Sequence, residues 1–142
     1  MAAPRELVIA THNRDKGREL VALLSDLPVR LHGLWEWPGA EDVPETGQTL
    51  AENAILKAEA AARLTGLWAV ADDTGLEVAA LGGGPGVYSA RFAGVGATYA
   101  GNRAKLLDLL AGVPPLQRGA RFRTVVALAR GRGEPRTVEG VV

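Results

Sequence analysis

Two adjacent carboxylates, Asp72 and Asp73, are the residues of this sequence best suited by type and position to chemistry. They follow a short apolar run, 67–71, that predicts a buried strand ending at the two acids. Acids at the carboxyl end of such a strand stand where open α/β sheets usually bind ligands. Because side chains alternate along a strand, we expect one acid to face a ligand or metal and the other a neighbouring group. The alternative is that Asp72-Asp73-Thr74-Gly75 starts a turn, for which these residue types are also suited.

A second polar group lies between an expected strand, 6–10, and an amphipathic helix that follows it. Its members are Thr11, His12, Asn13, Arg14, Asp15 and Lys16. A loop at a helix N-terminus offers backbone N–H groups and a favourable dipole to an anion, and Arg14 and Lys16 add positive charge. The loop is therefore a candidate phosphate site, with ordinary helix capping as the alternative.

Three further charged residues are candidates for the same chemistry. Glu45 precedes a capped helix and is placed to reach into a site, whereas Lys57 lies inside that helix among small apolar residues. A solvated surface lysine is the alternative for Lys57. The segment 87–91 offers the hydroxyl of Ser89 and the guanidinium of Arg91 to a phosphate group.

Capping and periodicity predict the elements that hold these residues. Thr49 and Glu52 form a capping box, in which the Thr49 hydroxyl accepts from the Glu52 N–H while the Glu52 carboxylate reaches back, so a helix is expected over 50–65. Gly66 suits the left-handed position after its end. Further strands are expected at 29–34 and 122–130, a helix at 98–111, and the chain stops inside or just before another strand.

Composition limits the classes of function. The 142 residues, 47% of them hydrophobic, suit one domain, and sixteen basic and sixteen acidic residues cancel, which argues against a nucleic acid polymer or a membrane as partner. No cysteine is present, so disulfides and thiolate chemistry are excluded, and two histidines are too few for a polyhistidine metal site. An oxygen-ligated metal remains. With no apolar stretch near the ~20 residues of a membrane span, the sequence predicts a cytoplasmic protein.

Five motifs, in this order, closely resemble those of the inosine triphosphate pyrophosphatase (Ham1-like) family. They are Thr11-x-Asn13-x-x-Lys16-x-x-Glu19, Glu45-Thr46-Gly47, Glu52-Asn53-Ala54-x-x-Lys57-Ala58, Ala71-Asp72-Asp73-Thr74-Gly75-Leu76 and Gly83-x-Pro85-Gly86-Val87-Tyr88-Ser89-Ala90-Arg91. Five ordered motifs are far more specific than any one of them, and the resemblance runs along the whole chain.

The resemblance implies an α/β fold with an elongated mixed β-sheet, flanking helices and a cleft between two lobes, here as one domain over 1–142. It also implies a homodimer that uses Mg²⁺ to hydrolyse ITP, dITP and XTP to the monophosphate and pyrophosphate, which removes deaminated purines from the nucleotide pool. By position, Asp73 matches the proton acceptor and metal ligand, and Glu45 the accompanying metal carboxylate. Residues 11–16 and Thr74 match triphosphate-binding positions, while Lys57 and Asp72 match polar residues lining that site.

Physical chemistry agrees with these roles. Mg²⁺ in proteins is typically held by one or two carboxylates together with substrate phosphates and water, and Glu45 and Asp73 can supply the carboxylates. Lys16 and Lys57 would supply positive charge to the phosphates. Either Asp73 or Asp72 would orient or deprotonate the attacking water, and the sequence leaves that choice open.

The sequence departs from the family pattern in two ways. Thr74 stands where serine is usual, and the later Gly-Phe-Gly-Tyr-Asp-Pro-like and Ser-His-Arg segments, which contact the base, are not present. We therefore expect a domain incomplete at its C-terminal end. One alternative function is a truncated fragment that binds nucleotide or dimerises with impaired catalysis, and another is a pyrimidine-directed pyrophosphatase of the similar Maf-like fold.

Overall fold

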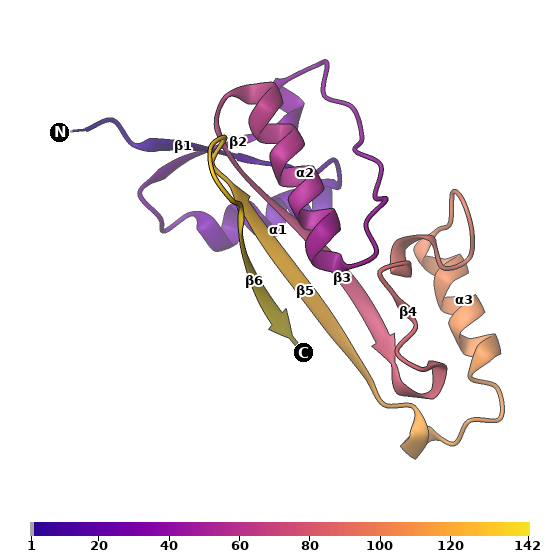
Figure 1. Cartoon of the computed structure of the whole chain (residues 1–142). Helices are drawn as coiled ribbons and strands as arrows, with labels where there is room; N and C mark the ends of the chain where they lie inside the picture. The colour runs from indigo at the N-terminus through magenta and orange to yellow at the C-terminus, as the bar shows by residue number, and fades with distance from the viewer. Residues whose placement is uncertain (1) are drawn as a thin grey trace. The chain divides into compact units, whose positions relative to one another are not determined.

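The computed structural model describes residues 2–142 and shows a mixed α/β fold (Figure 1). The strands are β1 (Arg5–Ile9), β2 (Val29–Gly33), β3 (Trp68–Val78), β4 (Pro85–Gly86), β5 (Ala120–Ala129) and β6 (Arg136–Val141). The α-helices are α1 (Arg14–Leu24), α2 (Leu50–Thr65) and α3 (Tyr99–Leu109), with short 3₁₀ turns η1 (Leu34–Glu36), η2 (Ala79–Leu81), η3 (Ser89–Arg91) and η4 (Pro115–Gln117). The strands form one mixed sheet in the order β2-β1-β3-β5-β6, with β4 paired to β3, so the predicted fold class is confirmed.

The chain divides into two compact units. Unit 1 holds the residues up to 72 together with 125–138, and unit 2 holds 73–124 and 139–142. Strands β3, β5 and β6 each contribute residues to both units, because the boundaries fall after Asp72, after Thr124 and after Val138. The expectations of a single incomplete domain and of a cleft between two lobes stay predictions.

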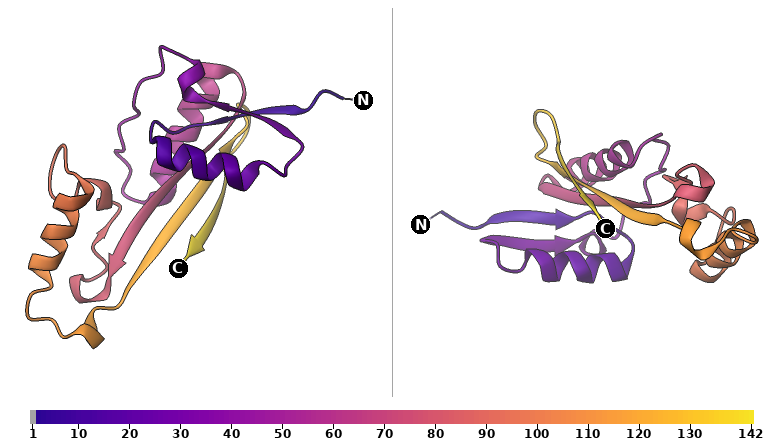
Figure 2. Two further views of the ribbon diagram at one scale, coloured as in Figure 1. Left: turned by 180° about the vertical axis from the view of Figure 1, so that it is seen from behind. Right: turned by 90° about the horizontal axis from the view of Figure 1, so that it is seen from below.

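Unit 1 is built around β1, which pairs in parallel with β2 and with β3. Helices α1 and α2 cover opposite faces of these strands (Figure 2). The alternation of strand side chains divides the core accordingly: Leu7 and Ile9 are buried with Val70, and Leu20 and Leu24 of α1 pack against them. Apolar residues at alternate positions of β1 therefore fix which face receives α1.

Helix α2 has the predicted bounds and one unpredicted contact. The Thr49 hydroxyl accepts from the Glu52 N–H at 3.1 Å, and Gly66 closes the helix with φ of +71°. The Glu52 carboxylate does not complete the predicted capping box. It accepts from the N–H of Gln48 at 2.6 Å, one residue earlier than expected, because the preceding loop passes close to the first turn of the helix.

The predicted end of the strand at Asp72 and Asp73 is wrong, as is the alternative of a turn there. β3 continues through both acids to Val78. Within unit 1 its first residues pair in parallel with β1 as far as Val70, and within unit 2 Leu76 pairs with Gly86 in an antiparallel register. A new strand partner thus supports the extended backbone where the sequence alone indicated an end.

Unit 2 contains α3 and the distal parts of β3 and β5. The Thr98 hydroxyl caps α3 by accepting from the N–H of Gly101 at 3.0 Å, so the helix begins one residue after the predicted position and ends at Leu109. Phe122 and Val142 exchange two backbone hydrogen bonds of 2.8 and 2.9 Å, the pattern of an antiparallel pair. The strand expected at the end of the chain is β6.

Within residues 2–142, no helix combines the length and the apolar character needed to cross a membrane.

One histidine in unit 1 lies between two carboxylates. His32 on β2 places Nε2 3.1 Å from the carboxylate of Glu6 on β1 and Nδ1 3.0 Å from that of Glu36 in η1. The edge of the Trp37 ring faces the imidazole, with 5.9 Å between ring centroids. The hydrogen bond to Glu36, and then that to Glu6, raises the pKa of His32 above its usual value of 6.5, although partial burial opposes this.

The raised pKa makes the stability of unit 1 depend on pH. Because the folded state holds the His32 proton more tightly than the unfolded state, its contribution is fully present below pH 6.5 and is lost as the pH rises through the folded-state pKa. We expect the urea midpoint of the parent to fall between about pH 6 and pH 9, and a His32→Gln variant to lack this component. Equal pH slopes for parent and variant would contradict the assignment.

Candidate functional site

The loop that follows β1 is fixed by hydrogen bonds from two of its own side chains. Asn13 caps α1, since its Oδ1 accepts from the N–H groups of Asp15 at 3.0 Å and Lys16 at 3.2 Å. The Thr11 hydroxyl accepts from the N–H of Asn13 at 3.1 Å. Ordinary capping, the alternative given by the sequence, is therefore present. Phosphate binding by this loop stays a prediction.

Lys16 and Asp72 form one of two lysine–carboxylate ion pairs in unit 1. The Lys16 Nζ lies 3.0 Å from the Asp72 Oδ2, which joins the first turn of α1 to β3. Asp72 is buried, with 7% of its surface exposed, while the Lys16 side chain is about one third exposed. A carboxylate at this depth is tolerable because a cation faces it. The contact therefore fixes the ammonium group of Lys16, the last residue of the loop 11–16, against β3.

Glu45 and Lys57 form the second pair. The Lys57 Nζ lies 3.3 Å from the Glu45 Oε1, and only 19% of the Lys57 side chain is exposed. The alternative that Lys57 is an ordinary solvated lysine is therefore wrong, because the loop before α2 covers it with a carboxylate. Unit 1 thus contains two lysines, each held against an acid that the sequence singled out.

The other loop residues have partners at the surface. His12 Nε2 lies 3.5 Å from an Asp42 carboxylate oxygen and 3.3 Å from the backbone oxygen of Glu41. Asp15 is 3.8 Å from the guanidinium of Arg18, and Arg14 is exposed. These contacts place His12, Arg14 and Asp15 on the outer side of the loop, whereas Lys16 turns toward Asp72.

Three predicted site residues belong to unit 2. Asp73 is buried on β3, and the hydroxyl of Thr74 lies 2.8 Å from that of Thr124 on β5. Arg91 is exposed, with its guanidinium 5.2 Å from the centre of the Tyr88 ring. The Ser89 hydroxyl donates to the Gly86 carbonyl at 2.6 Å and accepts from the Leu76 N–H at 2.8 Å, so it connects β3 to the segment 86–89, and its contact with a phosphate stays a prediction.

Sequence reasoning missed Thr124. The alternation of β5 placed it on an apolar face with Val126 and Leu128, and a lone hydroxyl on such a face was the available signal. The predicted joint role of Glu45 and Asp73 at a metal stays a prediction. Within residues 2–142, no group of three or more acids and histidines is arranged to hold a metal ion.

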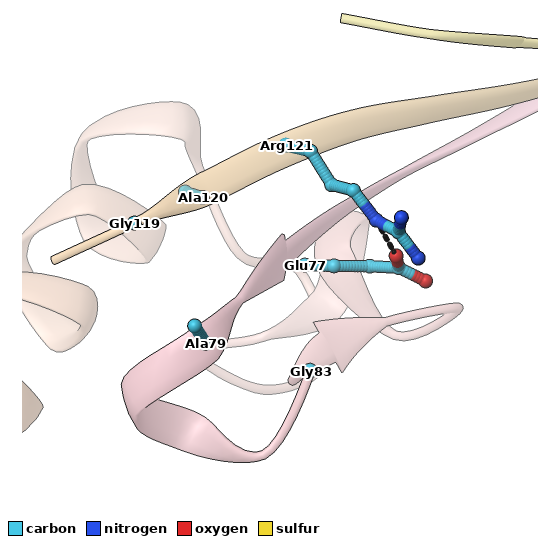
Figure 3. A pocket seen from close by; sticks show the side chains of 6 residues that line it. All are labelled: Glu77, Ala79, Gly83, Gly119, Ala120 and Arg121. Atoms are coloured by element: carbon cyan, nitrogen blue, oxygen red, sulfur yellow. Dashed lines mark hydrogen bonds and ion pairs between the residues drawn. The ribbon is translucent and has the colours of Figure 1, made fainter. Parts of the chain in front are cut away.

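Unit 2 also contains a pocket of about 360 Å³ lined by small residues and one ion pair (Figure 3). Its lining residues are Glu77, Ala79, Gly83, Gly119, Ala120 and Arg121. Arg121 Nε lies 2.6 Å from the Glu77 carboxylate, which also meets Arg123, and Arg123 in turn lies 2.7 Å from Glu139. The charges form a continuous ladder across β3, β5 and β6.

This ladder predicts an acid-sensitive component of stability. The hydrogen bond from Arg121 is the main cause that lowers the pKa of Glu77 below its usual 4.5, so the contribution is present above pH 4.5 and is lost as the pH falls through the folded-state pKa. Glu77→Gln should lower the urea midpoint at pH 7 and flatten its fall below pH 4.5. Glu134→Gln, at an exposed position, is the matched control. A Glu77 variant indistinguishable from this control would refute the role of the ladder.

The fold and the charged pairs define an α/β protein with two lysine–carboxylate contacts in unit 1, one to β3 and one between α2 and the loop before it. The model of the Ham1 family matches residues 7–142. The chain therefore belongs to the Ham1 family, as its motifs predicted.

Known relatives agree with this membership. A dITP/XTP pyrophosphatase from Desulforamulus reducens is 53% identical over 135 residues, covering 95% of this chain and 67% of the relative. One from Xanthomonas oryzae is 50% identical over 131 residues, covering 92% of this chain and 65% of the relative. The chain thus spans about two thirds of the length of these curated relatives. Among solved structures, a HAM1 protein from Coxiella burnetii is 42% identical with a TM-score of 0.85, covering 96% of this chain and 70% of that one.

Proposed function

We propose that this chain hydrolyses deaminated purine nucleoside triphosphates, such as ITP, dITP and XTP, to the monophosphate and pyrophosphate, and so removes them from the nucleotide pool. The relatives named dITP/XTP pyrophosphatase support the reaction class. The observation that carries the proposal is the presence in unit 1 of two partly buried lysines, Lys16 and Lys57, each next to an acid. The lysines can neutralise the charge of a triphosphate, and the carboxylates can bind a metal ion or accept the proton of the attacking water.

In the step we propose, a water oxygen attacks the α-phosphorus. The new bond forms between that oxygen and phosphorus while the bond from the α-phosphorus to the α,β-bridging oxygen breaks, and pyrophosphate leaves with the bonding pair. The proton of the water passes to a carboxylate. We assign the base to Asp73, because by position it matches the proton acceptor that the family resemblance implies.

The two lysines are proposed to neutralise the charge of the phosphates. An ammonium that already faces a carboxylate is held in place before the substrate arrives, so little reorganisation accompanies the reaction. Lys16 lies in the first turn of α1, which Asn13 caps. The positive end of the α1 dipole is therefore close to the loop of residues 11–16 and would add to the attraction for phosphate. Lys57 contributes from the second turn of α2.

The donor chemistry of these residues fits Mg²⁺. Glu45 and Asp73 are the proposed protein ligands, and carboxylate oxygen is the hard donor that this ion prefers. The described residues offer no cage of three or more protein ligands, which suits an ion that is completed by substrate phosphates and water. When bound, the ion would neutralise phosphate charge and polarise phosphoryl oxygens.

The oligomeric state and the cellular compartment of the chain are also proposals. We propose a homodimer in the cytoplasm, on the basis of the family resemblance and of a sequence without cysteine. The second candidate function is nucleotide binding with impaired catalysis, for which the two lysine–carboxylate pairs would be sufficient. Sedimentation of the purified chain tests the dimer, and the assays below separate the two functions.

The first test is pyrophosphate release from dITP, XTP, dATP, dGTP and dUTP, with and without Mg²⁺. We expect Mg²⁺-dependent release that favours dITP and XTP. Preference for dUTP would indicate the pyrimidine-directed alternative. No release from a chain shown to be folded by circular dichroism, together with calorimetric binding of Mg·dITP, would leave nucleotide binding as the function.

Removing the proposed base should abolish most of the catalysis. Asp73→Asn keeps the size of the side chain and removes its proton affinity, so we expect kcat for dITP to fall by roughly 100- to 10,000-fold. Asp108→Asn on the exposed part of α3 is the matched control and should behave as the parent. A Glu45→Ala, Asp73→Ala double variant that hydrolysed dITP at the parent rate would refute the assigned site.

Thr124 should affect the reaction through Thr74. The Thr74 and Thr124 hydroxyls lie 2.8 Å apart, and either can donate to the other. We propose that Thr124 is the donor when substrate is bound, which leaves the Thr74 proton for a phosphate oxygen. Thr124→Val preserves shape and removes this partner. We expect KM for dITP to rise about 3- to 10-fold with little change in kcat, in line with one lost hydrogen bond. Thr124→Ser should restore the parent KM, and a KM unchanged in Thr124→Val would exclude this orienting role.

A further inference from the structure

Asn53, in the first turn of α2, is fully buried. Its Oδ1 accepts from the backbone N–H of Gly47 at 2.8 Å. Gly47 lies in the loop that carries Glu45. The bond therefore connects the start of the helix with the loop, six residues earlier in the chain.

The other half of the Asn53 amide indicates why an asparagine is there. Nδ2 is enclosed, and among residues 2–142 it has no hydrogen-bond partner. A buried amide donor without a partner is unfavourable, and an apolar side chain of similar size would avoid that penalty. The requirement at this position is thus for the acceptor, Oδ1, which the N–H of Gly47 uses.

The loop comes so close to the helix that only glycine fits at position 47. A Cβ added to Gly47 would lie 2.6 Å from the Asn53 Oδ1 and 2.6 Å from the Cβ of Glu52. The next two residues are also anchored, because the Gln48 N–H donates to the Glu52 carboxylate and the Thr49 hydroxyl accepts from the Glu52 N–H. Three consecutive loop residues are therefore fixed on the first turn of α2.

The same loop places Glu45 one helical turn further along α2. Glu45 precedes Gly47 by two residues, and Lys57 follows Asn53 by four, so the contacts Gly47–Asn53 and Glu45–Lys57 lie side by side on one face of the helix. A shift of the loop at Gly47 would move Glu45 with it.

We infer that Asn53 is a positioning residue, which holds segment 45–49 in register on α2 so that the Glu45 carboxylate meets the Lys57 ammonium. The structural part of this inference stands on the contacts within unit 1. Its consequence for activity rests on the proposed function, in which Glu45 is a ligand of Mg²⁺.

Amide hydrogen exchange tests the structural part. Asn53→Leu removes the acceptor, and we expect the Gly47 amide to exchange about 10- to 100-fold faster than in the parent. Asn53→Asp retains an acceptor oxygen and should keep most of the protection. Unchanged protection of the Gly47 amide in Asn53→Leu would overturn the inference.

A second pair of variants distinguishes loss of the loop contact from loss of the fold. Gly47→Ala leaves Asn53 in place but forces the loop away, whereas Gly39→Ala adds the same methyl group where no atom lies within 4 Å. Protection of the Ala58 and Ala61 amides reports whether α2 is intact. With α2 intact, we expect faster exchange at Gln48 in Gly47→Ala and parent behaviour in Gly39→Ala. Equal exchange in the two variants would contradict the proposed anchoring.

The functional part is measured as a shift in metal requirement. In Asn53→Leu and Gly47→Ala, we expect the Mg²⁺ concentration for half-maximal pyrophosphate release to rise about tenfold or more, with rescue in Asn53→Asp and no change in Gly39→Ala. An active parent whose Mg²⁺ requirement equals that of Asn53→Leu would overturn the positioning role. An inactive parent would instead refute the proposed function, and the exchange experiment would still decide the role of Asn53.

Discussion

The change of partner along β3 is the constraint on which the arrangement of polar residues depends. β3 pairs in parallel with β1 as far as Val70 and with β4 in an antiparallel register from Leu76. Asp72, Asp73 and Thr74 lie between these two pairings, in backbone that is held extended from both ends. Successive residues of an extended strand point to opposite faces, so two adjacent acids receive different surroundings. Asp72 faces the Lys16 ammonium at 3.0 Å, and by the same alternation Asp73 points to the opposite face of the strand.

The lysine–carboxylate contacts of unit 1 are better understood as a charge arrangement than as a source of stability. Ion pairs with partly exposed members contribute little to folding, since desolvation and side-chain ordering offset the Coulomb attraction. These contacts keep two ammonium groups partly buried and fixed in position, with the charge of each balanced by a carboxylate. Under the proposed function, the phosphates of the substrate would compete with these carboxylates for ammonium groups that are already in place.

Local signals in the sequence were sufficient for some parts of the fold. Helix α2 follows the prediction from Thr49 to Gly66, because capping and helix propensity act over a few residues. The continuation of β3 beyond Asp73 was not predictable in the same way, since it depends on pairing with a segment ten residues later in the chain. The same limit applies to the site. The types and spacing of Lys16, Lys57 and the acids predicted a candidate site, but the pairing of Glu45 with Lys57 and of Thr74 with Thr124 depends on tertiary packing.

The buried face of α2 has a consequence for how firmly Asn53 and Lys57 are held. That face is made chiefly of alanines, with Ala54 and Ala58 fully enclosed and Ala61 and Ala62 nearly so. Alanine has no side-chain rotamers, so the helix rests on the sheet through groups that cannot change conformation or absorb a displacement. An interface of leucines could shift by repacking, whereas this one transmits any change in the height of the helix directly to Asn53 and Lys57, which lie next to these alanines on the helix surface. The distance between helix and sheet is thus set by the methyl groups of these alanines. The positions of Asn53 and Lys57 are therefore as closely fixed as that distance.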